Sequence, residues 1–274
     1  DTDRSRGLGD VYKRQLYDRL EKHYQTMVAS AAKAVNAPQD MPGVDFIKGQ
    51  SLKQAQYSES QTLGGSYLNN IMTMALSCCE VNAGMGRICA APTAGACGIL
   101  PAVLIETSRK LNSTKKEILD ALLVAAGFGA IFVRNSTVSG AEGGCQAEVG
   151  AASAMAAAAL VDIRGGTAEQ CAEAFAMALT NLEGLVCDPV AGLVEIPCIK
   201  RNVIGAMNAV SAADMALAGV VGHIPADEVI DAMAEVGNAM SQDLRETGIG
   251  GLAGTPTGRA ICEIVTMNGR EEEA

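Results

Sequence analysis

One stretch of this chain, AASAMAAAALV at residues 151–161, is apolar on every face that a helix would present. Such a helix has no polar side for water, so other helices must enclose it. Ala- and Met-rich runs recur along the 274 residues, and the alternating β-branched patterns typical of strands are scarce. We therefore predict an all-α chain folded as a compact single-domain helical bundle.

Apolar periodicity predicts a series of helices separated by long Gly- and Pro-rich loops. The run that starts at Pro101 opens where a missing amide hydrogen costs little, and STKKE at residues 113–117 is typical of a helix cap. The expected helices are residues 16–34, 67–81, 101–111, 113–134, 146–163, 167–182, 200–218 and 226–240.

Two terminal segments differ from the rest of the chain. Residues 1–15 are charged and lack a helical apolar period, so we interpret them as a non-native or disordered leader. Residues 267–274 are interpreted as a solvated acidic tail. The domain is therefore expected to span residues 16–266.

The charge balance excludes several classes of partner. The formal net charge is -10 and the sequence pI is about 4.8, whereas nucleic acids and anionic membrane surfaces attract clustered Lys and Arg. The longest apolar stretch, residues 121–133, is shorter than the roughly 20 residues that span a bilayer. We expect a soluble protein that binds small molecules or other proteins, not nucleic acid or membrane.

Nine cysteines form an odd set without the regular spacing of a secreted disulfide scaffold, and we expect no signal peptide before them. We therefore expect a cytoplasmic protein with reduced thiols. Cys145, Cys187 and Cys198 lie in the turn-forming contexts GGCQ, VCDPVAG and PCIKRN, outside any CxxC spacing. We interpret these three as candidates for a three-thiolate metal site. An iron–sulfur cubane ordinarily takes four protein ligands, so three would leave one iron free as a Lewis acid.

Four Gly- and Pro-rich loops each lead from or into a predicted helix. Free backbone amides at helix N-termini bind anions such as carboxylates. If the loops converge, they would form a polar pocket inside an apolar bundle. They are residues 86–102, 135–148, 184–202 and 246–259.

Three of these loops carry a resemblance to a known family. AAPTAGACGILPAVL, SGAEGGCQAEVGAASAMAAAAL and GLVCDPVAGLVEIPCIKRN closely resemble the alpha chain of bacterial iron–sulfur-dependent L-serine dehydratases, and the resemblance covers residues 63–259. It implies an all-α catalytic domain with a 4Fe-4S cluster on Cys145, Cys187 and Cys198. It also implies conversion of L-serine to pyruvate and ammonia without pyridoxal phosphate.

The resemblance leaves the catalytic base unassigned in this chain. His23 and His223, its only histidines, lie outside the family's active-site motifs. In the family an SSSHT-type motif comes from a beta chain or a fused beta domain. We expect no base here and a beta chain as partner. The chain ends MNGREEEA, so the terminal cysteine that caps the cluster in some relatives is not expected.

Five residues near the motif cysteines are candidate contacts for the substrate. Thr93 and Gly95 could hold the substrate carboxylate through a hydroxyl and exposed amides, and Ser139 and Gly140 are placed similarly before Cys145. Tight turns are the alternative interpretation of these loops. Arg201 could grip a carboxylate with two hydrogen bonds, or form a structural ion pair.

Other residues of the same loops have less specific expectations. Glu142 and Glu148 could bind the substrate ammonium, or could be a helix cap or solvated, and Asp188 is expected to orient its turn. Cys97 is left out of the metal site. The remaining cysteines are expected to be small buried side chains; they are Cys78, Cys79, Cys89, Cys171 and Cys262.

Two alternatives stay open at this point. A related iron–sulfur lyase could act on L-cysteine or another β-substituted amino acid, because the loops match a broader superfamily. A non-catalytic subunit that carries a structural or redox cluster is the alternative from another class. Four cysteine ligands would favour the non-catalytic subunit, whereas three favour catalysis.

Overall fold

The computed structural model describes residues 2–42, 44–57 and 61–272, with the side chains of residues 12–42, 44–57 and 61–267. Throughout these ranges the chain forms helices, turns and loops and contains no β-strand, which confirms the predicted all-α class. The α-helices are α1 (Thr2–Asn36), α2 (Gln50–Gln56), α3 (Gly65–Ala83), α4 (Ile99–Leu111), α5 (Lys115–Asn135), α6 (Gly140–Gly143), α7 (Ala151–Ile163), α8 (Ala168–Thr180), α9 (Cys198–Leu217), α10 (Ala226–Ala239) and α11 (Pro256–Glu272).

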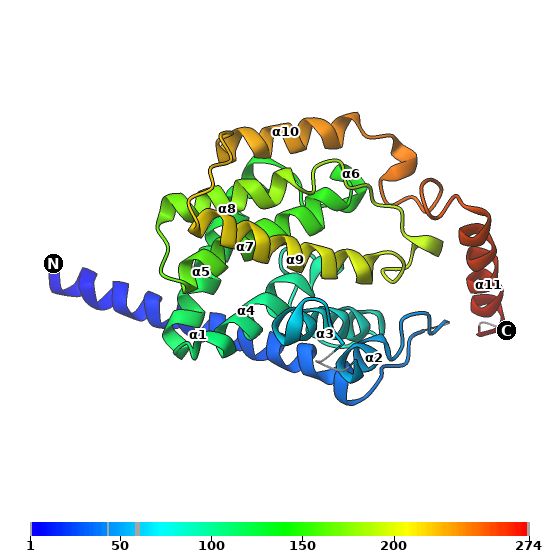
Figure 1. Ribbon diagram of the computed structural model, residues 1–274, viewed down its shortest axis with the longest axis horizontal. Coiled ribbons are helices and arrows are strands. Elements are labelled where there is room, and N and C mark those ends of the chain that lie inside the picture. The colour runs from blue at the N-terminus through cyan, green and yellow to red at the C-terminus, as the bar shows by residue number, and fades with distance from the viewer. Residues whose placement is uncertain (1, 43, 58–60, 273–274) are drawn as a thin grey trace.

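The apolar run that opened the sequence analysis is the central helix, α7. Every residue from Ala151 to Val161 is buried, and α4, α5, α8 and α9 pack against α7, which lies between α8 and α9 in Figure 1. Its lack of a polar face therefore has the predicted consequence, which is enclosure on all sides.

Small residues let α9 approach α7 and its neighbours closely. A Cβ atom on Gly205 of α9 would lie 2.6 Å from the Cδ1 atom of Ile99 and 2.9 Å from a methyl group of Val149, so a larger residue there would force these side chains to move. The Ser153 hydroxyl of α7 donates a hydrogen bond of 2.8 Å to the Gly205 carbonyl. This contact places the start of α9 beside the segment that precedes α7.

A buried carboxylate fixes the loop between α1 and α2. Glu80 of α3 is fully buried and accepts hydrogen bonds from the backbone amides of Gln39 and Gly49 at 2.9 and 2.8 Å. The Ser51 hydroxyl donates a third bond at 3.2 Å. A buried charge is tolerated when it is satisfied in this way, so Glu80 anchors this loop to α3.

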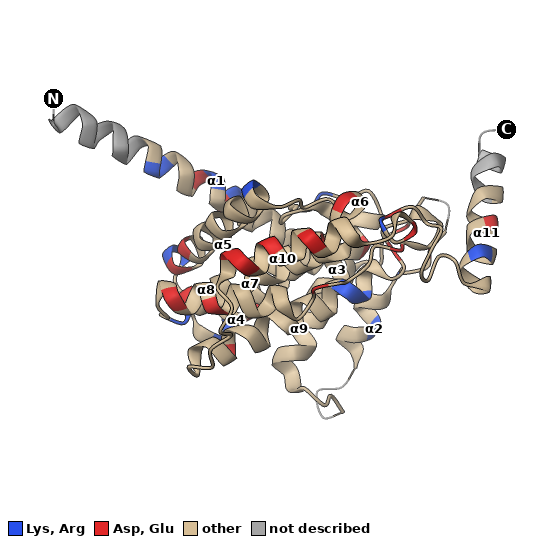
Figure 2. Ribbon diagram, turned by 90° about the horizontal axis from the view of Figure 1, so that it is seen from above, with Lys and Arg blue, Asp and Glu red and all other residues tan. Residues whose placement is uncertain are grey.

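Acidic side chains collect on the outer surface of α10. Figure 2 shows them along this helix, whose sequence ADEVIDAMAEVGNA has four acids and no Lys or Arg. Asp227, Glu228, Asp231 and Glu235 are all exposed, and they account for part of the net negative charge. Within the described ranges, none of the helices has the length and apolar character needed to cross a membrane.

The predicted helices are all present, and apart from the start of α1 and of the 146–163 helix their ends are shifted by at most two residues. STKKE does form a cap: Thr114 and Glu117 make a capping box at the start of α5. The expected helix at 146–163 begins as a π-helical segment, η2 (Gln146–Gly150), before α7. The sequence analysis missed α2, α6 and α11. α1 begins at Thr2 and includes most of the segment interpreted as a leader, and α11 continues to Glu272.

Candidate metal centre

Hydrogen bonds join the loops that carry Cys145 and Cys187. The backbone amide of Gln146 donates to the Leu185 carbonyl at 2.9 Å, and the Gln146 side-chain oxygen accepts a bond of 2.8 Å from the Gly184 amide. Gln146 is buried, so these bonds are shielded from water. These hydrogen bonds therefore hold the two loops next to each other.

A third loop pairs with the backbone of Cys187. Its amide donates to the Leu244 carbonyl at 2.8 Å, and its carbonyl accepts a bond of 2.6 Å from the Glu246 amide. Asp188 extends this link, because its Oδ2 atom accepts the Leu252 amide at 2.7 Å. Gly251 must be glycine here, since its φ is +58° and a Cβ atom would lie 2.3 Å from Asp188 Oδ2.

The fourth loop is attached through Asn202, a fully buried residue of α9. Its side-chain oxygen accepts the Gly98 amide at 2.9 Å, and its side-chain nitrogen donates to the Gly95 carbonyl at 2.7 Å. The same nitrogen also donates to the Cys198 carbonyl at 3.0 Å. Asn202 thus connects the segment 93–98 to the N-terminal turn of α9. The sequence analysis missed it, although an Asn among the Ala-rich residues of a helix is a signal that could have found it.

Two thiols and one carboxylate meet at this junction. The Sγ atoms of Cys145 and Cys187 and an oxygen of Glu148 all lie within 4.8 Å of one another. Both cysteines are buried, each with 3% of its surface exposed, and Glu148 is half-buried. These three residues could hold a metal ion. Glu148 follows Cys145 by three residues, and this spacing at the start of a helix is the sequence signal for its position.

Cys198 lies close to this group but outside it. It is buried at the first residue of α9. Burial raises the pKa of the Cys198 thiol to about 12, and the neighbouring Cys145 adds to the effect. The structure therefore brings Cys145 and Cys187 together directly, with Cys198 within electrostatic reach of Cys145.

The two paired thiols differ in acidity. The hydrogen bond from the Cys187 thiol lowers the pKa of Cys145, and Arg201 lowers it further, against the opposing effect of burial. The same hydrogen bond, together with burial, raises the pKa of Cys187. Cys145 is thus the first of the pair to become a thiolate, and thiolates are the form that binds metals.

Arg201 is already engaged by protein groups. Its Nη2 atom forms an ion pair of 2.7 Å with Asp188, and its Nη1 atom donates to the Val186 carbonyl at 2.7 Å. The structural ion pair considered for Arg201 is therefore present, and the Asp188 carboxylate joins this guanidinium to the Leu252 amide. Because Arg201 also lowers the pKa of Cys145, its positive charge acts at the thiols.

Three of the candidate substrate contacts surround the Glu148 carboxylate. The Thr93 hydroxyl donates to Glu148 at 2.7 Å. A Cβ atom on Gly95 would lie 3.0 Å from this carboxylate, and one on Gly140 would lie 2.7 Å from it and 3.0 Å from Cys187 Sγ. Burial raises the pKa of Glu148, and the Thr93 hydrogen bond acts against this.

Ser139 and Glu142 have positions that differ from those of the residues around Glu148. Ser139 is half-buried and immediately precedes α6, and its amide donates to the Thr137 hydroxyl at 3.1 Å. Glu142 is exposed and accepts a hydrogen bond from Thr137. Of the two acids that flank Cys145, only Glu148 therefore belongs to the group with the thiols.

The remaining cysteines and both histidines lie outside the group. Cys78, Cys79, Cys97 and Cys171 are buried and Cys89 is half-buried. The expectation of a buried Cys262 is wrong: it is exposed, because α11 packs mainly against η3 (Val190–Gly192) and leaves much of its surface to solvent. His23 and His223 are exposed, and the Nδ1 atom of His23 lies 3.8 Å from Cys89 Sγ.

The residues of this centre fit a group bound by thiolates. The Cys145 and Cys187 thiols are buried and hydrogen-bonded to each other, and the Arg201 guanidinium also bonds Cys145, as expected of ligands that approach one acceptor beside a compensating cation. Gly95 and Gly140 let the backbone approach the centre closely, because a Cβ atom on either residue would lie within about 3 Å of the Glu148 carboxylate. Sulfur donors in a dry site favour zinc or iron–sulfur groups over magnesium or calcium.

Comparison with known proteins adds independent information. The family model described as "Serine dehydratase alpha chain" matches residues 4–253. The "Probable L-serine dehydratase, alpha chain" of Bacillus subtilis is 48% identical over 250 residues, covering 91% of this chain and 83% of the relative. The "L-serine dehydratase, alpha chain" of Peptoniphilus asaccharolyticus is 47% identical over 248 residues, covering 90% and 85%. "L-serine dehydratase 1" of Escherichia coli is 39% identical over 247 residues, covering 88% of this chain but 54% of the relative.

Proposed function

The chain belongs to the serine dehydratase alpha chain family, and from this premise we propose that it is the alpha subunit of an L-serine dehydratase. Such an enzyme is a carbon–nitrogen lyase that converts L-serine to pyruvate and ammonia. The observation that carries the proposal is the meeting of the buried Cys145 and Cys187 thiols with the Glu148 carboxylate, at the end of α9 where Cys198 begins the helix.

We assign Cys145, Cys187 and Cys198 as the three ligands of a 4Fe-4S cluster. When bound, this cluster supplies a Lewis-acidic iron for the β-hydroxyl group of serine. Arg201 offsets the negative charge that three thiolates bring into a buried space, and Asp188 holds the guanidinium in place. The loops that carry the cysteines are tied together through Gln146.

The residues around Glu148 are proposed to bind serine. Glu148 would accept hydrogen bonds from the substrate ammonium, because the Thr93 hydroxyl fixes its carboxylate beside the thiols. Gly95 and Gly140 bring their backbone close to this carboxylate, and their backbone amides and those of nearby residues are donors suited to the substrate carboxylate.

Two further candidates complete the proposed substrate site. Ser139 precedes Gly140 and could contribute its hydroxyl from the edge of the site. A guanidinium has five N–H donors, so Arg201 retains donors for the substrate carboxylate beyond those given to Asp188 and Val186.

The base that removes the Cα proton is proposed to come from a beta chain. Both histidines of this chain are exposed and outside the thiol group. The Escherichia coli relative has additional length, since the match covers 54% of it, whereas the two alpha chains are covered to 83% and 85%. In this protein a separate beta chain would take the place of the additional length of the Escherichia coli relative.

Anaerobic reconstitution tests the cluster assignment. The chain is purified without oxygen, and bound iron and sulfide are quantified for the unchanged protein and for Cys145→Ser, Cys187→Ser and Cys198→Ser. Each variant should lose most of its iron. Cys78→Ser is the matched control, because Cys78 is equally buried and its Sγ atom lies 3.5 Å from the Ser30 hydroxyl, which could pair with a new serine. Full iron content in Cys198→Ser would remove that residue from the ligand set.

Pyruvate formation from L-serine tests the activity and the partner. We expect turnover when the reconstituted chain is combined with a beta chain, and none with either chain alone. Turnover by this chain alone would overturn the beta-chain assignment. L-cysteine is the comparison substrate, and a higher kcat/KM for L-cysteine than for L-serine would replace the proposed substrate.

A further inference from the structure

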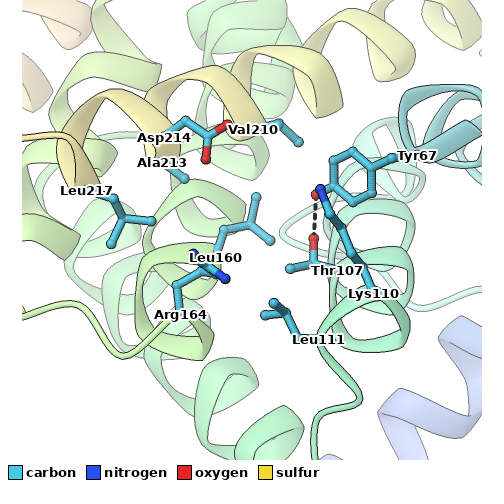
Figure 3. Close-up of a pocket in the computed structure, with 10 residues that line it drawn as sticks. All are labelled: Tyr67, Thr107, Lys110, Leu111, Leu160, Arg164, Val210, Ala213, Asp214 and Leu217. Carbon is cyan, nitrogen blue, oxygen red and sulfur yellow. Dashed lines mark hydrogen bonds between the residues drawn. The ribbon is translucent and has the colours of Figure 1, made fainter. Parts of the chain in front are cut away.

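A second cavity lies between α3, α4, α7 and α9, with a volume of about 260 Å³. Figure 3 shows the side chains that surround it, which come from four separate helices and point toward a common space. Its wall includes Leu160 of α7 and Ala213 of α9, and both are buried. The cavity therefore has an apolar floor within the core of the bundle.

The position of this cavity separates it from the cysteine group. α9 begins at Cys198 and reaches the cavity at Val210, twelve residues later, which at a rise of 1.5 Å per residue is roughly 18 Å. α7 likewise starts beyond Cys145 and ends at Ile163, next to Arg164. None of the three motif cysteines lines the cavity. It is a distinct site at the opposite ends of the same helices.

Three charged side chains of mixed sign surround the cavity. Lys110 of α4, Arg164 at the end of α7 and Asp214 of α9 all line it, and Figure 3 shows them on different sides of the opening. All three are exposed. The ion pairs found among the described side chains include none of them, so their charges are available to a ligand.

Two hydroxyl groups add polar atoms deeper in the cavity. The Tyr67 and Thr107 hydroxyls are hydrogen-bonded at 2.7 Å, and the Lys110 ammonium lies 4.3 Å from the centre of the Tyr67 ring. Burial raises the pKa of Tyr67, the Asp214 charge raises it further and the Arg164 charge lowers it. The charges of Asp214 and Arg164 therefore both act on the Tyr67 phenol, so both residues lie around the same cavity.

The mixture of charges selects the class of ligand. A simple anion would leave Asp214 without a partner beside it, and a simple cation would be repelled by Lys110 and Arg164, which outnumber Asp214. A zwitterion satisfies both signs, with its carboxylate toward the two cations and its ammonium toward the acid. Pockets for drug-sized ligands begin at roughly 300 Å³. The volume of this cavity is slightly smaller, so its ligand must be small.

We propose that this cavity binds a small α-amino acid with an apolar side chain. Arg164 and Lys110 receive its carboxylate, Asp214 receives its ammonium, and the side chain packs against Leu160 and Ala213. This site is additional to the proposed substrate site and does not depend on it.

Titration calorimetry with L-valine as the probe tests the proposal on the full chain. L-valine should bind, and Arg164→Gln and Asp214→Asn should each weaken it by about tenfold or more, since a charge-assisted hydrogen bond is lost. These positions are exposed, so both variants should fold normally. Arg134→Gln and Asp231→Asn are the matched controls, because both residues are exposed and lie outside the cavity; they should bind L-valine like the unchanged chain.

Analogues that lack one charge sharpen the test. Isovalerate, which has no ammonium, should bind the unchanged chain about tenfold more weakly than L-valine, and Asp214→Asn should not weaken isovalerate further. Absence of L-valine binding at millimolar concentration would overturn the proposal, as would binding that Arg164→Gln and Asp214→Asn leave unchanged. The readout requires neither iron nor turnover, so its failure would leave the proposed dehydratase function untouched.

Discussion

Asn202→Ala is the substitution with the most directly calculable effect on the loops of the metal centre. The change removes the partner of the Gly98 amide, which donates to Asn202 at 2.9 Å, and the partner of the Gly95 carbonyl, which accepts from it at 2.7 Å. The Cys198 carbonyl keeps its helical partner, because it also accepts the amide of residue 202 within α9. Two polar groups are therefore orphaned.

The expected cost follows from these two groups. An orphaned buried polar group costs about 1–3 kcal/mol, and Asn202 is fully buried, so we expect a loss of about 2–6 kcal/mol in the free energy of unfolding. Equilibrium unfolding in urea measures it as a lower midpoint with an unchanged slope. Asn238→Ala is the control, because Asn238 is exposed on α10, and it should change stability by less than about 0.5 kcal/mol. A loss below about 1 kcal/mol for Asn202→Ala would refute the argument that this side chain holds the 93–98 segment.

Three further substitutions test other parts of the structure. Gly140→Ala should lower bound iron in reconstituted protein several-fold, since the new methyl group would lie 3.0 Å from Cys187 Sγ; unchanged iron would show that the loop can yield. Burial and the Asp45 charge raise the pKa of Glu195 to about 7, so the folded state binds a proton more tightly than the unfolded state. Stability should therefore fall as pH rises from about 4.5 to about 7, by about 2 kcal/mol from this group. Urea unfolding at pH 5 and 7.5 should show that Glu195→Gln removes this fall, and an equal fall in the variant would contradict it. Glu80→Ala should lower stability by about 3 kcal/mol, because it orphans two buried amides and a hydroxyl; a loss below about 1 kcal/mol in the same assay would exclude it as an anchor.

The helical framework could be predicted because its signals are local. The run at 151–161 has no polar face, and enclosure follows from that fact alone, as the burial of α7 confirms. The capping box at Thr114 likewise depends on only four consecutive residues. Such features depend on neighbours in sequence, so a single chain without relatives is enough to find them.

The missed elements depend on contacts that a sequence does not display. α11 follows a Gly-rich loop and has Ile264 and Met267 exposed, so its apolar residues did not indicate a buried face. The π-helical turn at Gln146–Gly150 has no compositional signature, yet it contains Glu148. Helical segments of this kind frequently occur at functional sites. The meeting of Glu148 with two thiols from different loops is a tertiary fact that spacing alone does not give.

The arrangement of α7 and α9 explains how an apolar bundle can support two polar sites. Each helix has a buried face along its middle, where Ala and Gly residues allow close packing, and polar groups are expensive in such an interior unless they are paired, as Ser153 and Asn208 are. The charged residues of both helices therefore lie toward their ends. One end carries the cysteine loops, joined by Asn202 and Gln146. The other carries Arg164 and Asp214 around the second cavity, so the rigid middle of the bundle holds both sites in fixed positions relative to each other.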